Sequence, residues 1–260
     1  MYVIGLDIGG TKIEGILVKS TAGGAVPNIL KKIRMPTQFR RSGMCNLRSR
    51  FAKASAGKQA VISNIVSVVV SLYRFGRENI RGFKLSGVGI GTAGFLKGGR
   101  LEMVPNIPAI KGIRLKEVLL QKLQRRKIKV QLYVENDSIC FALAEFMFGA
   151  ARGCEDVIGV IVGTGIGSGL ILDGRLYKGR DGGAGHIGHT TIDPSGPKCG
   201  CGQRGHFESW CSGRHITLRY IAAGGKMTNP DPKKIFHSNE AVARKVMAET
   251  YDKFGIALPI

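Results

Sequence analysis

The chain has 260 residues, 43% of them hydrophobic, so it is long enough for one large domain or two medium ones and too apolar for a disordered protein. Its formal net charge is +21, from 39 Lys and Arg against 18 Asp and Glu, which would attract polyanions. The basic residues are dispersed, and no zinc-finger, homeodomain or RNP-like pattern accompanies them, so we expect no dedicated nucleic-acid site.

Membrane and secretory signals are not visible in the sequence. No apolar run reaches the ~18–20 residues that a membrane span needs, and the N-terminus lacks the pattern of a signal peptide. Six unevenly spaced cysteines do not form a disulfide framework in a chain of this size. We therefore expect a cytoplasmic protein with reduced thiols and no membrane partner.

The first half of the chain predicts strands that end in glycine-rich turns. Residues 2–18 (YVIGLDIGGTKIEGILV) predict strand, turn and strand, because apolar residues alternate on both sides of the glycines. Residues 34–57 are basic and poorly periodic, which predicts a loop, and a helix is expected over 61–73. Another strand and glycine-rich turn follow at 85–95, and residues 115–126 have the apolar spacing of a helix.

The second half repeats the opening pattern. Residues 127–149 predict a strand, a polar junction (VENDS) and an apolar helix, and residues 157–177 again predict strand, glycine-rich turn and strand. This duplication predicts two similar α/β domains, which we place at 1–114 and 115–260. The chain after Gly213 is predicted to be mainly helical.

Two glycine-rich segments are candidate phosphate-binding loops, DIGGTK (7–12) and VGTGIGSG (162–169). Glycines let backbone N–H groups approach an anion closely, and Thr11 and Thr164 add hydroxyl donors. Neither segment has the spacing of a Walker A loop. An ordinary hairpin turn is the alternative for each, and the presence of both favours a nucleotide site.

The VENDS segment places Asn136 and Asp137 at the end of a strand, just before a helix. An Asp at this position can act as a general base, because a helix N-terminus favours its ionised form. The alternative is an N-cap, a frequent role of Asp and Asn.

A segment rich in Gly and Pro, from His186 to Trp210, contains a candidate metal site. Its ligand types are two cysteines and two histidines, in the pattern His189-x9-Cys199-x-Cys201-x4-His206. Two thiolates and two imidazoles make up a closed tetrahedral set of the structural zinc type. The alternative is free cysteines and solvent-facing histidines. His186 precedes this set and can face a ligand, and zinc would also position the carboxylate of Glu208.

Together, DIGGTK, VENDS, VGTGIGSG and HIGH…CGCGQRGHFESWCSG resemble the ROK family of sugar kinases and related repressors, in order along the whole chain. The resemblance implies an α/β actin/hexokinase-like fold with two RNase H-like domains around a cleft. It also implies an ATP-dependent kinase for a hexose or N-acylhexosamine, with glucose and N-acetylmannosamine as the first candidates, and with Mg²⁺ and a structural Zn²⁺. Dimers are usual in this family, so a homodimer is compatible with it.

The resemblance also assigns roles to individual residues. It implies that Asp137 is the catalytic base. It places the sugar at Asn106, Asn136, His186, His189 and Glu208, and the phosphates of ATP at Asp7, Gly9, Gly10, Thr11, Lys12, Gly163, Thr164 and Gly165. It places zinc at His189, Cys199, Cys201 and His206.

The sequence departs from the family pattern in three places. Many relatives have Glu where this chain has His186, while bacterial N-acetylmannosamine kinases also carry His there. His206 stands where a third cysteine is usual. The family continues beyond FGIALPI with an adenine-binding turn, so the second domain is expected to be incomplete. One alternative function is therefore a non-catalytic sugar-binding remnant. Another is a ROK-type transcription regulator, although such regulators carry a helix-turn-helix before the kinase-like part.

Overall fold

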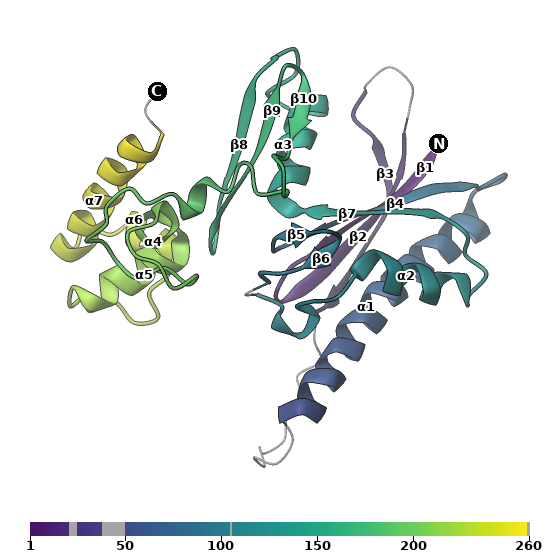
Figure 1. The fold of residues 1–260 in the computed structure, drawn as a ribbon, viewed down its shortest axis with the longest axis horizontal. Coiled ribbons are helices and arrows are strands. Elements are labelled where there is room, and N and C mark those ends of the chain that lie inside the picture. Colours follow the sequence, from purple (N-terminus) through teal and green to yellow (C-terminus); the bar gives the residue numbers. More distant parts are fainter. Residues whose placement is uncertain (21–24, 38–49, 105, 259–260) are drawn as a thin grey trace. The chain divides into compact units, whose positions relative to one another are not determined.

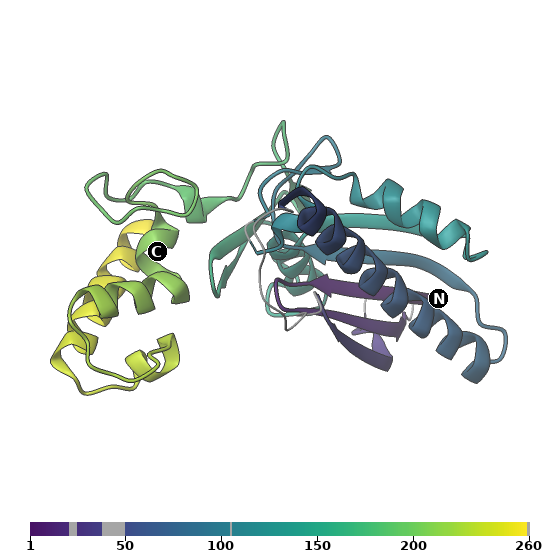
Figure 2. The ribbon, with the colours of Figure 1, turned by 90° about the horizontal axis from the view of Figure 1, so that it is seen from below.

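The computed structural model describes residues 1–20, 25–37, 50–104 and 106–258, with only the backbone of 50–56. It divides into two compact units (Figures 1 and 2). Unit 1 comprises Met1–Cys154 and Gly179–Gly183, and unit 2 comprises Glu155–Lys178 and Ala184–Ile260.

Unit 1 is built on a five-stranded sheet with the order β3-β2-β1-β4-β7. Its antiparallel half is formed by β1 (Tyr2–Ile8), β2 (Lys12–Lys19) and β3 (Asn28–Pro36), and its parallel half joins β4 (Leu85–Thr92) and β7 (Gln131–Asn136) to β1. The short strands β5 (Leu96–Lys97) and β6 (Arg100–Leu101) form a separate hairpin. The carboxyl ends of β1, β4 and β7 therefore lie at one edge of the sheet.

Helix α1 (Arg50–Asn79) lies along the strands of unit 1, as Figure 2 shows, and contacts β2 and β3. Its stretch Gly57–Asn79 is long and apolar enough to cross a membrane, but half of the most apolar part is buried. Val61, Ile65 and Leu72 are fully buried in the core of the unit, so α1 is a core helix. The unit is completed by η1 (Pro108–Ile110), α2 (Leu115–Gln124) and α3 (Asp137–Phe148).

The expected loop over 34–57 differs from the structure at both of its ends. Strand β3 continues to Pro36, and α1 already begins at Arg50. Strand β3 has no fully buried residue, so it lacks the alternating pattern that predicts a strand. The first turns of α1 are rich in alanine, which has the highest helix propensity and gives no apolar period.

Unit 2 is built on a three-stranded antiparallel sheet with the order β10-β9-β8, among the residues that the structure describes. The strands are β8 (Val157–Val162), β9 (Ile166–Leu172) and β10 (Arg175–Tyr177). The short 3₁₀ helix η2 (Ile187–His189) and α4 (Phe207–Cys211) follow. From Gly213 on, the described chain is mainly helical, as predicted, with α5 (Gly213–Ala222), α6 (Pro232–Phe236) and α7 (Ala241–Ala257).

The division between the units lies after Cys154, whereas the sequence pattern placed a boundary at residue 114. Residues 115–154 belong to unit 1 because β7 pairs in parallel with β4 and because α2 contacts both α1 and β7. A pairing between strands that are about 40 residues apart leaves no local sequence signal.

Candidate functional site

The first glycine-rich segment forms a tight turn between β1 and β2. The N–H of Gly9 donates to the carbonyl of Lys12 at 2.9 Å, which closes the turn. A Cβ atom on Gly10 would lie 2.8 Å from the carbonyl oxygen of Asn106, closer than real Cβ atoms approach, so the position accepts only glycine. The turn thus brings two predicted elements together, the DIGGTK loop and the backbone of Asn106.

Two carboxylates lie next to this turn. Asp7 is near the end of β1, opposite Gly91 of β4, and a Cβ atom on Gly91 would lie 3.7 Å from the Cα of Asp137. Partial enclosure and then the charge of Asp137 raise the pKa of Asp7, while the charge of Lys12 acts in the opposite direction. The ends of β1 and β7 therefore concentrate negative charge that can accept a proton or attract a cation.

The N-cap of α3 is Asn136, and Asp137 is the first residue of the helix. The Oδ1 atom of Asn136 accepts hydrogen bonds from the amides of Ser138 (3.0 Å) and Ile139 (3.3 Å). Its Nδ2 donates to the carbonyl of Gly94 at 2.9 Å. The cap expected as the alternative role of Asp137 is therefore supplied by Asn136, which is buried and uses its amide within the protein.

The second glycine-rich segment forms the turn between β8 and β9, and the carboxylate of Glu208 lies directly against it. Glu208 Oε2 accepts from the amide of Ile166 at 2.9 Å, and a Cβ atom on Gly165 would lie 2.5 Å from that oxygen. The carbonyl of Gly163 accepts from the amide of Gly213 at 2.8 Å. Unit 2 thus holds Gly163–Gly165 between Gly213, at the start of α5, and Glu208. The family resemblance implies that Glu208 binds the sugar.

Four side chains of unit 2 form a cluster, here called the His/Cys cluster. Its ligand atoms all lie within 4.8 Å of one another, and they belong to His189, Cys199, Cys201 and His206. His189 ends η2, and His206 is the residue before α4. A backbone bridge between Thr191 and His206 holds these two segments side by side.

Three of the distances between ligand atoms of the His/Cys cluster lie in the range of tetrahedral coordination. The Nδ1 atoms of His189 and His206 are 3.4 Å apart, Cys201 Sγ is 3.4 Å from His206 Nδ1, and Cys199 Sγ is 3.7 Å from His189 Nδ1. Zn–N bonds of about 2.05 Å and Zn–S bonds of about 2.3 Å imply ligand separations of about 3.3–3.8 Å in a tetrahedron. These three pairs are therefore spaced as around a zinc-sized ion, and all four ligand atoms lie within 4.8 Å of one another.

The protonation of the cluster also bears on metal binding. Burial and then the charge of His189 lower the pKa of His206, which favours the neutral imidazole that a metal needs. Burial raises the pKa of the Cys199 thiol to about 11. Without a cation this sulfur is a thiol, and a bound metal would convert it to the thiolate.

The segment around the cluster is attached to α7 through Trp210. The guanidinium of Arg219 and the ammonium of Lys253 lie 4.7 and 4.6 Å from the centre of the indole ring. Lys253 also pairs with Asp193 at 2.9 Å, which lowers the pKa of that carboxyl. His186 lies just before η2, partly exposed, and is not one of the four clustered side chains.

The predicted residues thus form two groups, one in each unit, and the order of the motifs agrees with a known family. Residues 3–259 match the ROK family. The chain belongs to the ROK family.

Two ROK relatives define the similarity in sequence. The chain is 31% identical to a glucokinase of Thermotoga maritima over 228 residues, which are 87% of this chain and 62% of that protein. It is 30% identical to an N-acetylmannosamine kinase of Escherichia fergusonii over 238 residues, which are 91% of this chain and 69% of that protein. The chain thus spans less than two thirds of the length of the Thermotoga relative.

A solved structure extends the similarity to the fold. A ROK family glucokinase from Streptomyces griseus, crystallised with glucose and AMPPNP, has a TM-score of 0.72 and 27% identity to this chain. The match covers 99% of this chain and 78% of that one. The fold is therefore the α/β actin/hexokinase-like fold of the ROK sugar kinases, as the sequence predicted.

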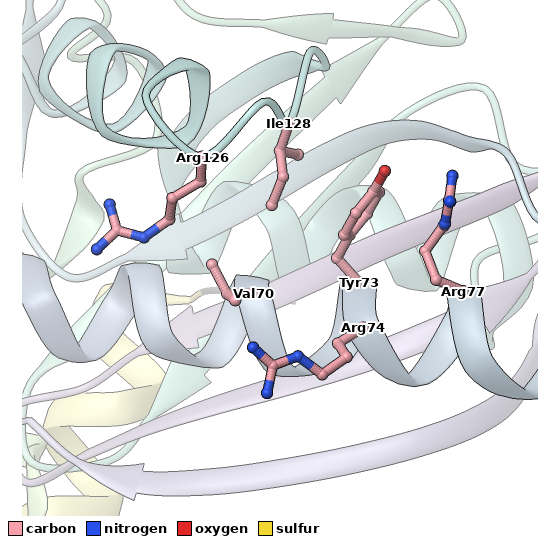
Figure 3. A pocket seen from close by; sticks show the side chains of 6 residues that line it. All are labelled: Val70, Tyr73, Arg74, Arg77, Arg126 and Ile128. Atoms are coloured by element: carbon pink, nitrogen blue, oxygen red, sulfur yellow. The ribbon is translucent and has the colours of Figure 1, made fainter.

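This ROK chain also has a cavity of about 420 Å³ in unit 1, between α1 and the segment after α2 (Figure 3). Figure 3 shows the side chains around it, which are Val70, Tyr73, Arg74, Arg77, Arg126 and Ile128. None of the predicted site residues lines this cavity. Its lining includes three guanidinium groups and no carboxylate, and it carries part of the positive charge of the chain.

Sequence reasoning did not identify several residues that hold the ROK motifs in place. In unit 2 these are Trp210, Lys253 and Asp193, whose carboxylate also accepts from the amide of Ser195 at 3.1 Å. The DPSG sequence signals that turn. In unit 1 they are Thr37 and Asn64, which bond behind the first glycine-rich turn and have no sequence signal.

Proposed function

We propose that this chain is an ATP-dependent kinase that phosphorylates a hydroxyl group of a hexose or N-acylhexosamine. The observation that carries the proposal is the arrangement in unit 1, where Asp7 and Asp137 interact electrostatically beside the turn of Gly9 and Gly10. Phosphoryl transfer needs a carboxylate near the acceptor hydroxyl and backbone donors near the phosphates. Kinship with glucokinases and N-acetylmannosamine kinases supports the same reaction.

In the proposed reaction, the carboxylate of Asp137 accepts the proton of the sugar hydroxyl. The hydroxyl oxygen forms a bond to the γ-phosphorus of ATP, the bond from that phosphorus to the β–γ bridging oxygen breaks, and ADP leaves with the bonding electrons. The backbone at Gly9–Lys12 and, in unit 2, at Gly163–Gly165 binds the phosphates. Catalysis then depends mainly on positioning and on charge neutralisation.

The residues beside the first turn also fit a divalent cation. Burial and, after it, the like charge of Asp137 raise the pKa of Asp7, and a nearby cation would oppose both effects. Asp7 would hold Mg²⁺ together with the phosphates of ATP. When bound, Mg²⁺ would neutralise part of the negative charge of the phosphates.

The His/Cys cluster would hold a structural Zn²⁺ through His189, Cys199, Cys201 and His206. The support is the closeness of the four side chains, with three ligand distances in the tetrahedral range. Such an ion would fix the loop that leads into α4 and hence the position of Glu208. Metal analysis of the purified protein should find about one zinc per chain, and a folded protein without metal that still binds sugar would overturn the assignment.

The acceptor is proposed to be glucose or N-acetylmannosamine, with Asn106, Asn136, His186, His189 and Glu208 around the sugar. Relatives with each activity support both candidates. Since Asn136 already caps α3 and bonds to Gly94, we expect it to contact the sugar only through its remaining amide hydrogen. The cytoplasmic location and the homodimer stay predictions.

The test is ADP release from Mg-ATP with glucose, N-acetylmannosamine, N-acetylglucosamine and fructose, for the wild type and Asp137→Asn. We expect turnover with one of these sugars and a loss of at least 100-fold in kcat in the variant, because general-base catalysis contributes about 10²–10⁴. Sugar binding, measured by calorimetry, should persist in the variant. Asp252→Asn, at an exposed position of α7, is the matched control and should leave kcat unchanged.

The outcomes separate the alternatives. Unchanged turnover in Asp137→Asn would show that Asp137 is not the base. A folded wild type that binds a sugar but neither binds nor cleaves ATP would instead indicate a sugar-binding protein without catalytic activity.

A further inference from the structure

Two polar side chains are buried behind the first glycine-rich turn. Thr37, directly after β3, is 0% exposed, and Asn64, in the middle of α1, is 5% exposed. Buried polar groups reduce stability unless their hydrogen bonds are made. Both therefore need hydrogen-bond partners, and those partners indicate what the two side chains do.

Thr37 makes two hydrogen bonds to the turn itself. Its hydroxyl donates to the carbonyl of Gly9 at 2.6 Å, and its backbone N–H donates to the carbonyl of Thr11 at 3.0 Å. One residue thus anchors two carbonyl groups of the DIGGTK loop, from a position 28 residues away in the sequence.

The hydrogen bond to Gly9 also fixes the direction of the next N–H group. A trans peptide is planar, and its C=O and N–H point in opposite directions. The structure has no cis peptide bonds among its described residues. Because the carbonyl of Gly9 points toward buried Thr37, the N–H of Gly10 points away from it, to the exposed side of the turn.

Asn64 supports Thr37 from the next layer. Its Nδ2 donates to the carbonyl of Pro36 at 3.0 Å and to the carbonyl of Thr37 at 3.5 Å. The side-chain amide of Asn64, in the core helix α1, thereby fixes the backbone on both sides of the Pro36–Thr37 peptide. The turn is also confined by Asn106, since a Cβ atom on Gly10 would lie 2.8 Å from the Asn106 carbonyl oxygen.

We propose that Thr37 is a positioning residue that aims the Gly10 N–H at a phosphate group of the nucleotide, and that Asn64 holds Thr37 in place. This rests on the proposed kinase function, since the phosphate is that of Mg-ATP. Neither side chain touches the substrate. The effect is preorganisation, because an N–H donor that is already aimed needs no reorientation when the anion binds.

The experiment compares Thr37→Val, which keeps the shape and removes the hydroxyl, with Thr37→Ser, which keeps the hydroxyl. Loss of one aimed donor should raise the KM for Mg-ATP, and the Kd for the nucleotide measured by calorimetry, about tenfold in Thr37→Val. Thr37→Ser should stay within about twofold of the wild type, and the KM for the sugar should not change in either variant. Asn64→Leu should raise the KM for Mg-ATP about threefold and provides a second test if Thr37→Val does not fold.

Thr250→Val is the matched control, because Thr250 is a buried threonine of unit 2 whose hydroxyl donates to the carbonyl of Val246 in α7 and accepts from Arg219 of α5. If the role of Thr37 is purely structural, Thr37→Val should lower the Tm and the active fraction, as the control does, and leave the KM for Mg-ATP unchanged. That result would overturn the inference alone.

A wild type that binds nucleotide but phosphorylates no sugar would overturn the proposed function only, and the nucleotide Kd of Thr37→Val would then decide the inference. A wild type that binds no nucleotide would overturn both.

Discussion

The two units of the chain are stabilised in different ways. Unit 1 buries one continuous aliphatic core between its five-stranded sheet and its helices. Unit 2 has a three-stranded sheet and two small buried clusters, one around Tyr220 and one around Phe207. Its strands β8 and β9 also expose large apolar side chains, namely Ile158, Val162 and Leu172.

Unit 2 compensates with polar and aromatic connections. Glu208 bonds to the start of β9, Arg219 pairs with Glu249, and Lys253 pairs with Asp193 while both cations lie on Trp210. Small hydrophobic cores in proteins are often supplemented by a metal ion or disulfides. Unit 1 is therefore stabilised mainly by apolar burial, whereas unit 2 relies more on polar and aromatic contacts, to which we propose that a metal ion in the His/Cys cluster adds.

Loss of the metal should have the largest effect and should be confined to unit 2. Binding of structural zinc contributes on the order of 10 kcal/mol to the folding of small zinc domains. We expect Cys199→Ala, or removal of zinc with a chelator, to abolish the folding transition of unit 2 and to leave that of unit 1 intact. Trp210 is the only tryptophan and reports on unit 2, while hydrogen exchange in β1 and β4 reports on unit 1.

The control for this variant is Cys154→Ala, because Cys154 is exposed and belongs to unit 1. Simultaneous unfolding of both units on chelation would show that the comparison is wrong and that the two form one cooperative system.

A cavity in the core of unit 1 should have the next largest effect. Leu72 is fully buried, so Leu72→Ala should lower the free energy of unfolding of unit 1 by about 2–5 kcal/mol. A denaturant titration monitored by hydrogen exchange in β1 and β4 would measure this free energy. The fluorescence transition of Trp210, in unit 2, serves as an internal reference. Ile29→Ala, at a position that is 57% exposed, should change little. Equal effects of the two variants would contradict a single apolar core.

The smallest effect concerns acid stability. Hydrogen bonds from Lys32 and then Arg34 lower the pKa of Glu14 from its ordinary value of 4.5 to about 2. A carboxyl whose pKa is lowered in the folded state stabilises it above pH 4.5, and this contribution is lost as the pH falls toward 2. The difference in unfolding midpoint of unit 1 between wild type and Glu14→Gln should therefore be constant above pH 4.5 and shrink below it.

Glu117→Gln is the control, since Glu117 and its partner Arg114 are both about half exposed. A difference that stays constant down to pH 2 would show that the cluster around Glu14 contributes nothing by ionisation.

Much of this organisation could be predicted from the sequence. The glycine-rich hairpins and the helix after VENDS have local patterns, and the ligands of the His/Cys cluster have a diagnostic spacing. The exposed strand β3 and the start of α1 have no such pattern. The affiliation of β7 with unit 1 depends on its pairing with β4, which only the folded chain reveals.

The positioning network of Thr37 and Asn64 was not predictable for a similar reason. Thr37 follows a basic strand and Asn64 lies in an apolar helix, and neither segment has a pattern that marks the residue. Their task arises from contacts across 27 or 28 residues, and hydrogen bonds of that range follow from the fold and not from periodicity. The same holds for Glu208, whose bond to Ile166 spans 42 residues.

Strand β3 has a further consequence for how copies of this protein meet. It is the outermost strand on its side of the five-stranded sheet, and it carries Lys31, Lys32 and Arg34. An uncovered strand edge is a template for pairing with another chain, and lysine-rich edges prevent this, because two copies would bring like charges together. The single carboxylate of Glu14 does not neutralise all three cations. Among the residues that the structure describes, β3 is the edge strand, and we expect its charges to oppose sheet-to-sheet aggregation at this border of unit 1.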